Sequence, residues 1–138
     1  MLDTSSLTKA INALSRSLGI AESKQTKADS ELFETVKAGV IQNFEVCFEL
    51  CWKFIQRWIK ENRTPEEAST PRTRKDLFRL AARIGLIKDP LRWFLFGDAR
   101  NLTSHIYDGE KADIVYQITQ EFLENARYLL TQLESSND

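Results

Sequence analysis

Apolar residues recur every three or four positions along most of the chain, which is the spacing of an amphipathic helix. The first apolar stripe consists of Leu7, Ile11, Leu14 and Leu18. Residues that can cap a helix precede it at positions 3–6, so we expect the first helix to begin there. The stretch 22–30 is polar and predicts a loop.

A much longer helical pattern runs from about Glu31 to Asn62. Its apolar positions fall mostly on one face and are Phe33, Val36, Val40, Phe44, Cys47, Phe48, Cys51, Phe54, Ile55, Trp58 and Ile59. Leu50 and Trp52 widen this face, so parts of the helix should be buried on more than one side. Contacts with its own bundle and with a second subunit would explain this, and we therefore expect a homodimer.

Start and stop signals delimit the next predicted helix. A polar loop at 63–70 is followed by Thr70-Pro71, a capping side chain with proline at the first helical position. Gly85 is a natural stop for this helix.

Two more helices follow in the C-terminal part of the chain. Asp89-Pro90 predicts the start of a helix that runs toward His105, and Asp108-Gly109 predicts its end. A last helix is expected from about Glu110, with a frayed tail at 134–138.

The fold predicted from these patterns is all-α. No stretch shows the two-residue alternation of a strand, and a length of 138 residues suits one domain over 1–138. We expect an up-and-down helical bundle of four main helices plus a short one, joined by short loops.

The charges are unevenly distributed although the formal net charge is only −1. Residues 63–100 carry nine basic and five acidic side chains, a local excess that can attract a phosphate backbone but also fits a solvated helix face. The basic residues that could face RNA are Arg63, Arg72, Arg74, Lys75, Arg79 and Arg83.

The sequence favours a cytoplasmic protein without a membrane segment. Its N-terminus lacks the basic start and apolar run of a signal peptide, and no apolar stretch approaches the roughly 18 residues that span a bilayer. Two cysteines without an export signal point to free thiols in a reducing compartment.

The single histidine, His105, lies in a polar run that starts at Arg100. Imidazole titrates near neutral pH, and a guanidinium can stabilise a phosphate that gains charge, so the two suit metal-free cleavage of a phosphodiester. On an ideal helix they would lie about 140° apart. The arginine stem, or a change of helix geometry near Asp108-Gly109, would have to bring them together.

Two neighbouring stripes would instead flank a polar groove near the helix end. One stripe consists of Asp98, Asn101 and His105, and the other of Arg100, Thr103 and Tyr107, with Ser104 in the same polar run. The residues alone favour a helix-end histidine with a local hydrogen bond, because Arg-x4-His by itself is a weak motif that occurs by chance.

A metal site is not expected. One histidine provides no pair of ligands, and Cys47 and Cys51 fit buried, inert thiols on an apolar helix face better than a tetrahedral site. Glu45 and Glu49 share a helix face and suggest acid–base chemistry, but Glu49 is better placed to pair with Lys53 four residues on.

Read together, several motifs resemble a known family. They are Ile41-Gln42-Asn43-Phe44-Glu45, Phe48-Glu49-Leu50-Cys51-Trp52-Lys53, Asp89-Pro90 with Trp93, Asp98-Ala99-Arg100-Asn101 and His105-x-Tyr107. In this order they are similar to the HEPN superfamily, specifically its HepT-like branch, long labelled nucleotidyltransferase substrate-binding proteins. The resemblance covers most of the chain.

The resemblance implies a small helical bundle that dimerises and a partner, a minimal nucleotidyltransferase encoded next to it. In HepT-like toxins the Arg-x4-His motif forms a ribonuclease centre where two protomers meet. Arg100 and His105 would then be the catalytic pair and Asn101 the polar residue after the arginine. Tyr107 matches the tyrosine to which the partner adds AMP, which silences the toxin.

Three functions therefore compete. The first is a metal-independent RNA endonuclease without a cofactor, in which His105 acts as the general base on a ribose 2′-hydroxyl. The second is a non-catalytic subunit whose Arg100 and Asn101 bind a nucleotide or another substrate for the partner. The third is a structural dimerisation module.

Overall fold

Residues 2–135 of the computed structural model are described here, and their regular structure is entirely helical. The long helices are α1 (Ser5–Ala21), α3 (Ser30–Asn62), α6 (Pro90–Leu102) and α7 (Gly109–Ser135). The shorter ones are α2 (Lys24–Lys27), α4 (Pro65–Ser69), α5 (Arg74–Arg83) and a 3-10 turn, η1 (Thr103–His105). The predicted all-α bundle is confirmed.

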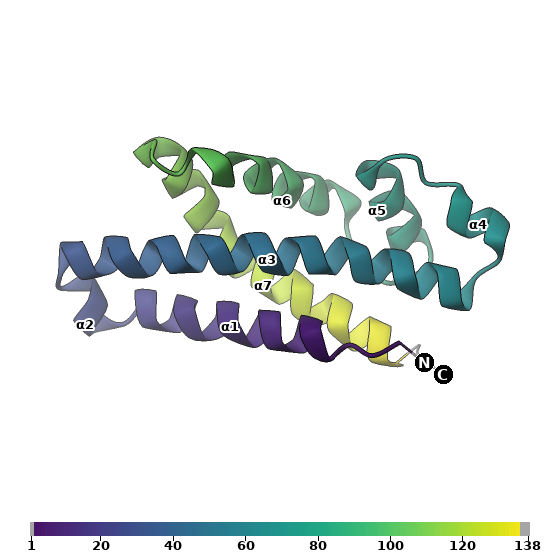
Figure 1. Ribbon diagram of the computed structural model, residues 1–138, viewed down its shortest axis with the longest axis horizontal. Coiled ribbons are helices and arrows are strands. Elements are labelled where there is room, and N and C mark those ends of the chain that lie inside the picture. The colour runs from purple at the N-terminus through teal and green to yellow at the C-terminus, as the bar shows by residue number, and fades with distance from the viewer. Residues whose placement is uncertain (1, 136–138) are drawn as a thin grey trace.

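Helix α3 runs the length of the molecule, and the other long helices pack along it (Figure 1). Its 33 residues span about 50 Å at the rise of an α-helix. The helix begins where the Asp29 carboxylate accepts hydrogen bonds from the N–H groups of Glu31 and Leu32. Helix α1 lies along one side of α3, α6 along the other, and α7 crosses behind it.

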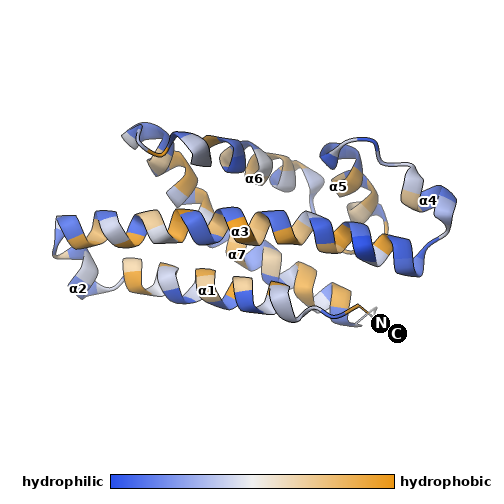
Figure 2. Cartoon of the chain, viewed as in Figure 1, coloured by the Kyte–Doolittle hydropathy of each residue, from blue (hydrophilic) through white to orange (hydrophobic). Residues whose placement is uncertain are grey.

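The amphipathic stripes of the sequence become one apolar core. Apolar and polar positions alternate in bands along α1 and α3 (Figure 2). Aromatic rings join the long helices: Phe48 of α3 lies 6.1 Å from Phe78 of α5, 6.4 Å from Trp93 of α6 and 6.3 Å from Phe122 of α7, measured between ring centroids. This cluster fixes the three later helices on α3.

Local signals place several helix ends where the sequence predicts them. The Asp89 carboxylate accepts the N–H of Leu91, and Pro90 occupies the first turn of α6. Gly85 follows α5 with a φ of +88°, in the left-handed region that glycine adopts without strain. Asp108 caps the start of α7 by accepting the N–H of Glu110.

The predicted helix start at Thr70-Pro71 is wrong. The helix starts at Arg74 instead, because the Thr73 hydroxyl accepts the N–H of Asp76 and so satisfies an orphan donor of the first turn. A Thr-Pro start signal operates earlier, at Thr64, where it produces the short α4 inside the predicted loop.

Other predicted boundaries shift as well. The predicted loop at 22–30 contains α2, which the Ser23 hydroxyl caps. Helix α7 includes residues 134 and 135 of the predicted frayed tail, and the rest of that tail lies outside the described residues. Within residues 2–135, no helix combines the length and the apolarity that crossing a bilayer demands.

A polar contact closes the end of the bundle where α1, α3 and α7 meet. The Tyr116 phenol on α7 donates a hydrogen bond to the Glu22 carboxylate after α1, and its ring packs edge-on against Phe33 of α3. The hydrogen bond from Tyr116 is the main reason that the pKa of Glu22 is lowered, and a hydrogen bond from Lys27 adds to it.

We expect Tyr116→Phe to lower the free energy of unfolding by about 0.5–1 kcal/mol near neutral pH, since it removes a partly exposed hydrogen bond but keeps the ring. A lowered folded-state pKa of Glu22 stabilises the protein fully above the ordinary carboxyl pKa. That advantage is lost as the pH falls through the lowered value. Urea unfolding of wild type and Tyr116→Phe across the acid range measures this loss of stability. A difference in unfolding free energy between the two proteins that does not change with pH would contradict the prediction.

Candidate active site

The polar run between Arg100 and Tyr107 is not one continuous α-helix. Helix α6 ends at Leu102, and a 3-10 turn covers 103–105 before the chain bends into α7. The Thr103 hydroxyl donates to the Arg100 carbonyl oxygen at 2.7 Å and accepts from the Arg100 guanidinium at 3.3 Å. The change of helix geometry therefore starts at Thr103, earlier than the expected position near Asp108-Gly109.

Arg100 is oriented by carboxylates of the long helix α3. Its Nε donates to Glu49 Oε1 at 2.9 Å, and its Nη2 lies 3.7 Å from Glu45 Oε1. The side chain is 27% exposed, so part of the guanidinium remains open to solvent. The expected pairing of Glu49 with Lys53 is wrong, because Arg100 approaches Glu49 from the neighbouring helix.

Glu49 contacts several side chains of this site. Its Oε2 accepts a hydrogen bond from the Trp52 indole at 2.9 Å, and Arg74 Nη1 of α5 lies 3.7 Å from its Oε1. One carboxylate therefore connects α3, α5 and α6. Glu45 contributes a second carboxylate, so the formal charges of the two arginines and the two glutamates balance.

His105 and Tyr107 form a separate pair on the exposed turn. His105 Nδ1 lies 3.3 Å from the Tyr107 hydroxyl, and the two rings meet edge to face at 5.9 Å. Tyr107 is 84% exposed. Within the part of the chain that the structure describes, His105 Nε2 has no hydrogen-bond partner, so this nitrogen can exchange a proton with a ligand.

The structure separates the predicted site residues into two groups. No hydrogen bond links Arg100 to His105 among residues 2–135. Asp98 and Asn101, which share the predicted stripe with His105, line a cavity of about 270 Å³ on the side of α6 that faces α5. The exposed Ser104 hydroxyl donates to the Asn101 carbonyl oxygen at 3.3 Å.

Glu49 belongs to this polar site through a partner, Arg100, that the sequence did not predict. Its signal is the spacing of Glu45 and Glu49, which places two carboxylates on one helix face. The pattern identifies the acidic face, but the cation that meets it comes from a position 51 residues away in the chain.

The cysteines and acidic residues offer no metal centre in the described part of the chain, where no three ligand-type side chains converge. Cys47 and Cys51 are free and buried, as the apolar face of α3 predicts. Burial is the main reason that the pKa of the Cys51 thiol is raised, which keeps it protonated and unreactive.

Comparisons with known proteins agree with one another. The family model described as "Nucleotidyltransferase substrate binding protein like" matches residues 2–135. A Haemophilus influenzae protein named "Probable ribonuclease HepT" is 39% identical over 104 residues, which are 75% of this chain and 71% of the relative.

Solved structures have the same fold. One from Haemophilus influenzae, described as the fold of a substrate-binding domain of a nucleotidyltransferase, has a TM-score of 0.88 and 34% identity and covers 96% of this chain and 99% of its own. One from Thermus thermophilus has a TM-score of 0.71 at 25% identity over 90% and 98% of the two chains. A toxin-antitoxin structure with AMP-PNP has a TM-score of 0.63 at 23% identity over 96% and 99%.

We expect a double-mutant cycle on Glu49→Gln and Arg100→Met to give a coupling free energy of about 1 kcal/mol, because the contact is a charge-assisted hydrogen bond with both side chains half-buried. Urea unfolding of the four proteins measures this coupling. The exposed pair Asp76 and Arg79 is a matched control and should couple more weakly. Equal coupling for both pairs would show that Glu49 does not hold Arg100.

Proposed function

Because the chain belongs to the HepT-like family of nucleotidyltransferase substrate-binding proteins, we propose that it is a toxin ribonuclease of a two-gene module. It would cleave RNA without a metal through Arg100 and His105, and a partner nucleotidyltransferase would silence it by adding AMP to Tyr107. The name of the Haemophilus influenzae relative supports the ribonuclease activity. RNA as substrate and two free thiols favour the cytoplasm.

The observation that carries this proposal is the exposed imidazole of His105 beside a chain segment that also presents a guanidinium. Nδ1 is engaged by the Tyr107 hydroxyl, which leaves Nε2 for proton transfer. Arg100 is held by Glu49 but remains partly exposed. An acid–base group and a fixed cation are the two functions that cleavage of RNA by its own 2′-hydroxyl requires.

In the first half of the proposed reaction, His105 Nε2 takes the proton of the ribose 2′-hydroxyl. The 2′-oxygen forms a bond to phosphorus, and the bond from phosphorus to the 5′-oxygen breaks. Arg100 stabilises the negative charge that builds on the non-bridging oxygens. The products are a 2′,3′-cyclic phosphate end and a 5′-hydroxyl end.

The leaving 5′-oxygen needs a proton that a second group must supply. We assign it to His105 of a second copy in a homodimer, so that each strand break uses two imidazoles. The single protomer supports a role for a second copy. In it Arg100 is hydrogen-bonded to Glu49 of α3 and His105 contacts Tyr107, so the two do not contact each other. A second copy facing the same turn would complete the constellation.

Tyr107 has the exposure that modification by a partner requires, with 84% of its surface accessible. Its oxygen would attack the α-phosphorus of ATP on the nucleotidyltransferase, pyrophosphate would leave, and the phenolic proton would be lost. The added AMP places bulk and a negative charge next to His105, where it would repel the phosphates of RNA.

A second function is favoured by one contact. Glu45 and Glu49 already surround the Arg100 guanidinium, which suits a module that presents a bound substrate rather than one that cleaves it. In that case the chain is a non-catalytic, nucleotide-binding subunit of the partner. Cleavage of RNA by the isolated chain distinguishes the two functions.

We expect the purified chain to cleave single-stranded RNA in the presence of EDTA and His105→Ala to lose at least about a hundredfold in rate, since a positioned general base contributes that much. Gel analysis of the products should show 2′,3′-cyclic phosphate ends. Ser69→Ala, which removes an exposed hydroxyl on α4 outside the predicted site, serves as the control and should retain activity. A requirement for Mg²⁺ would exclude this mechanism. No cleavage by the folded wild-type chain would favour the binding subunit.

We expect Tyr107→Phe to abolish the transfer of labelled AMP from ATP by the partner nucleotidyltransferase, because it removes the accepting oxygen. Tyr128→Phe is the matched control, since Tyr128 is half-buried under the Lys88 ammonium. Autoradiography and mass spectrometry of the modified peptide measure the transfer. Labelling of Tyr107→Phe at the level of wild type would place the modification elsewhere.

A further inference from the structure

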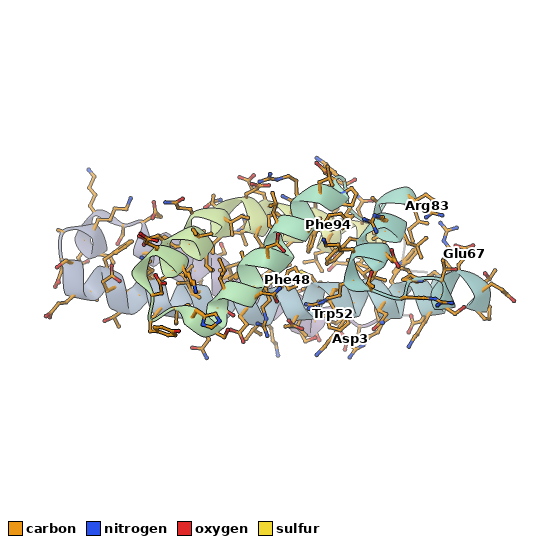
Figure 3. All side chains as sticks on the ribbon, turned by 90° about the horizontal axis from the view of Figure 1, so that it is seen from above. Asp3, Phe48, Trp52, Glu67, Arg83 and Phe94 are labelled. Atoms are coloured by element: carbon orange, nitrogen blue, oxygen red, sulfur yellow. The ribbon has the colours of Figure 1, made fainter. Side chains whose placement is uncertain are left out.

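The cavity between α5 and α6 has no role in the reaction proposed above. It measures about 270 Å³ and opens beside the residues that precede and follow Arg100. Its walls are largely aromatic and are formed by Phe48, Phe78, Trp93 and Phe94. Figure 3 shows Phe94 of α6 between α5 and α6, with Phe48 and Trp52 of α3 nearby.

Trp93, one of the residues that line this cavity, carries a buried hydrogen-bond donor without a partner among the described residues. Trp93 has no exposed surface, and its indole Nε1 makes no hydrogen bond to any described residue. Buried donors in folded proteins are nearly always paired, and an unpaired one is unfavourable.

The charged residues that line the cavity are two cations, Arg74 and Lys75, and one carboxylate, Asp98. Lys75 Nζ lies 5.4 Å and the Arg79 guanidinium 5.1 Å from the centroid of the Phe94 ring. Arg74 also lines the cavity, and its guanidinium lies 5.7 Å from the Trp52 ring. These side chains belong to α5, so an anionic group at the cavity mouth would meet both their charges and the positive end of the helix dipole.

An aromatic cavity lined by two cations suits a nucleotide, whose flat base and phosphate have the matching chemistry. The volume lies just below the range of roughly 300–1,000 Å³ that is usual for small-molecule pockets. It therefore suits one base, with the sugar and phosphate outside. Asp98 and Asn101 at the wall offer an acceptor and an amide for the edge of the base.

We propose that this cavity is a base-binding subsite for single-stranded RNA, which rests on the ribonuclease function proposed above. One base takes the place of the Lys75 ammonium over the Phe94 ring, and the adjoining phosphate then contacts Lys75 and Arg74. Arg74 also shares Glu49 with Arg100, and Asn101 follows Arg100 in the chain. A strand anchored in the cavity is thereby led to the guanidinium at which cleavage would occur.

Binding is best measured on the His105→Ala background, which keeps the RNA intact. Fluorescence anisotropy with a labelled single-stranded RNA oligonucleotide should show that Phe94→Ala weakens binding about tenfold, the usual effect of removing a stacking ring. Phe33→Ala is the matched control, because Phe33 is also a half-buried aromatic residue but lies at the other end of the bundle. Equal losses in both variants would overturn the proposal.

A charge substitution avoids any dependence on the folding of Phe94→Ala. Lys75 is exposed, and we expect Lys75→Gln to weaken RNA binding severalfold and to reduce the salt dependence of the affinity. Lys88→Gln, an exposed lysine over the Tyr128 ring, should leave both unchanged. An affinity and salt dependence of Lys75→Gln equal to those of wild type would overturn the proposal.

Crosslinking identifies the surface that the base contacts. Oligonucleotides with one 4-thiouridine, irradiated in the complex, should attach to the peptide that contains Trp93 and Phe94. Crosslinks found only elsewhere would overturn the assignment. Free AMP tests whether the cavity binds a base of RNA or a free nucleotide. If AMP displaces the RNA when both are at the same concentration, the cavity binds a free nucleotide instead.

The subsite and the ribonuclease function can fail separately. If wild type cleaves RNA and Phe94→Ala and Lys75→Gln bind RNA as well as their controls do, the subsite is wrong and the ribonuclease stands. If wild type does not cleave RNA but both variants still weaken RNA binding, the ribonuclease is wrong and the subsite stands.

Discussion

The packing of Phe48 is the constraint on which the rest of this fold depends. The ring is fully buried on α3 and contacts aromatic rings of α5, α6 and α7. The next residue in the helix is Glu49, which lies about 100° further around the helix and therefore leaves the core as Phe48 enters it. The contact that holds α6 on α3 thus also brings Arg100 to its carboxylate. The site is a direct consequence of the core.

The pairing of Arg100 with Glu49 would have two effects on a phosphate that binds as proposed. It restricts the rotamers of a long side chain, so that less conformational entropy is lost when an anion binds. It also competes with the anion, because the same guanidinium cannot be fully engaged by both. A half-buried pair of this kind contributes only about 1 kcal/mol. A phosphate can therefore displace Glu49 in part, and the positive charge of Arg74 compensates for the carboxylate that remains.

Local signals in the sequence predict most of the fold. The predictions fail where a feature depends on contacts between residues that are far apart in the chain. Apolar periodicity and the caps at Asp89 and Gly85 act within one or two helical turns, so they can be read directly. Thr73 overrides Thr70-Pro71 because a cap one turn later satisfies the first amides of α5, and composition alone does not rank the two. The partner of Glu49 depends on how α6 packs against α3. The spacing of residues within α3 does not predict that packing.

The contact between His105 and Tyr107 connects the proposed catalysis with the proposed inhibition. Tyr107 engages Nδ1, so the residue proposed for modification also orients the imidazole proposed for proton transfer. For Nε2 to act as the base, Nδ1 must carry the ring proton and donate it to the Tyr107 oxygen. An AMP ester on that oxygen would make it a weaker acceptor, and its phosphate would add a negative charge beside the ring. The contact that orients the imidazole would then be weaker. Modification at this position would therefore oppose the general base directly as well as obstruct the path of the RNA.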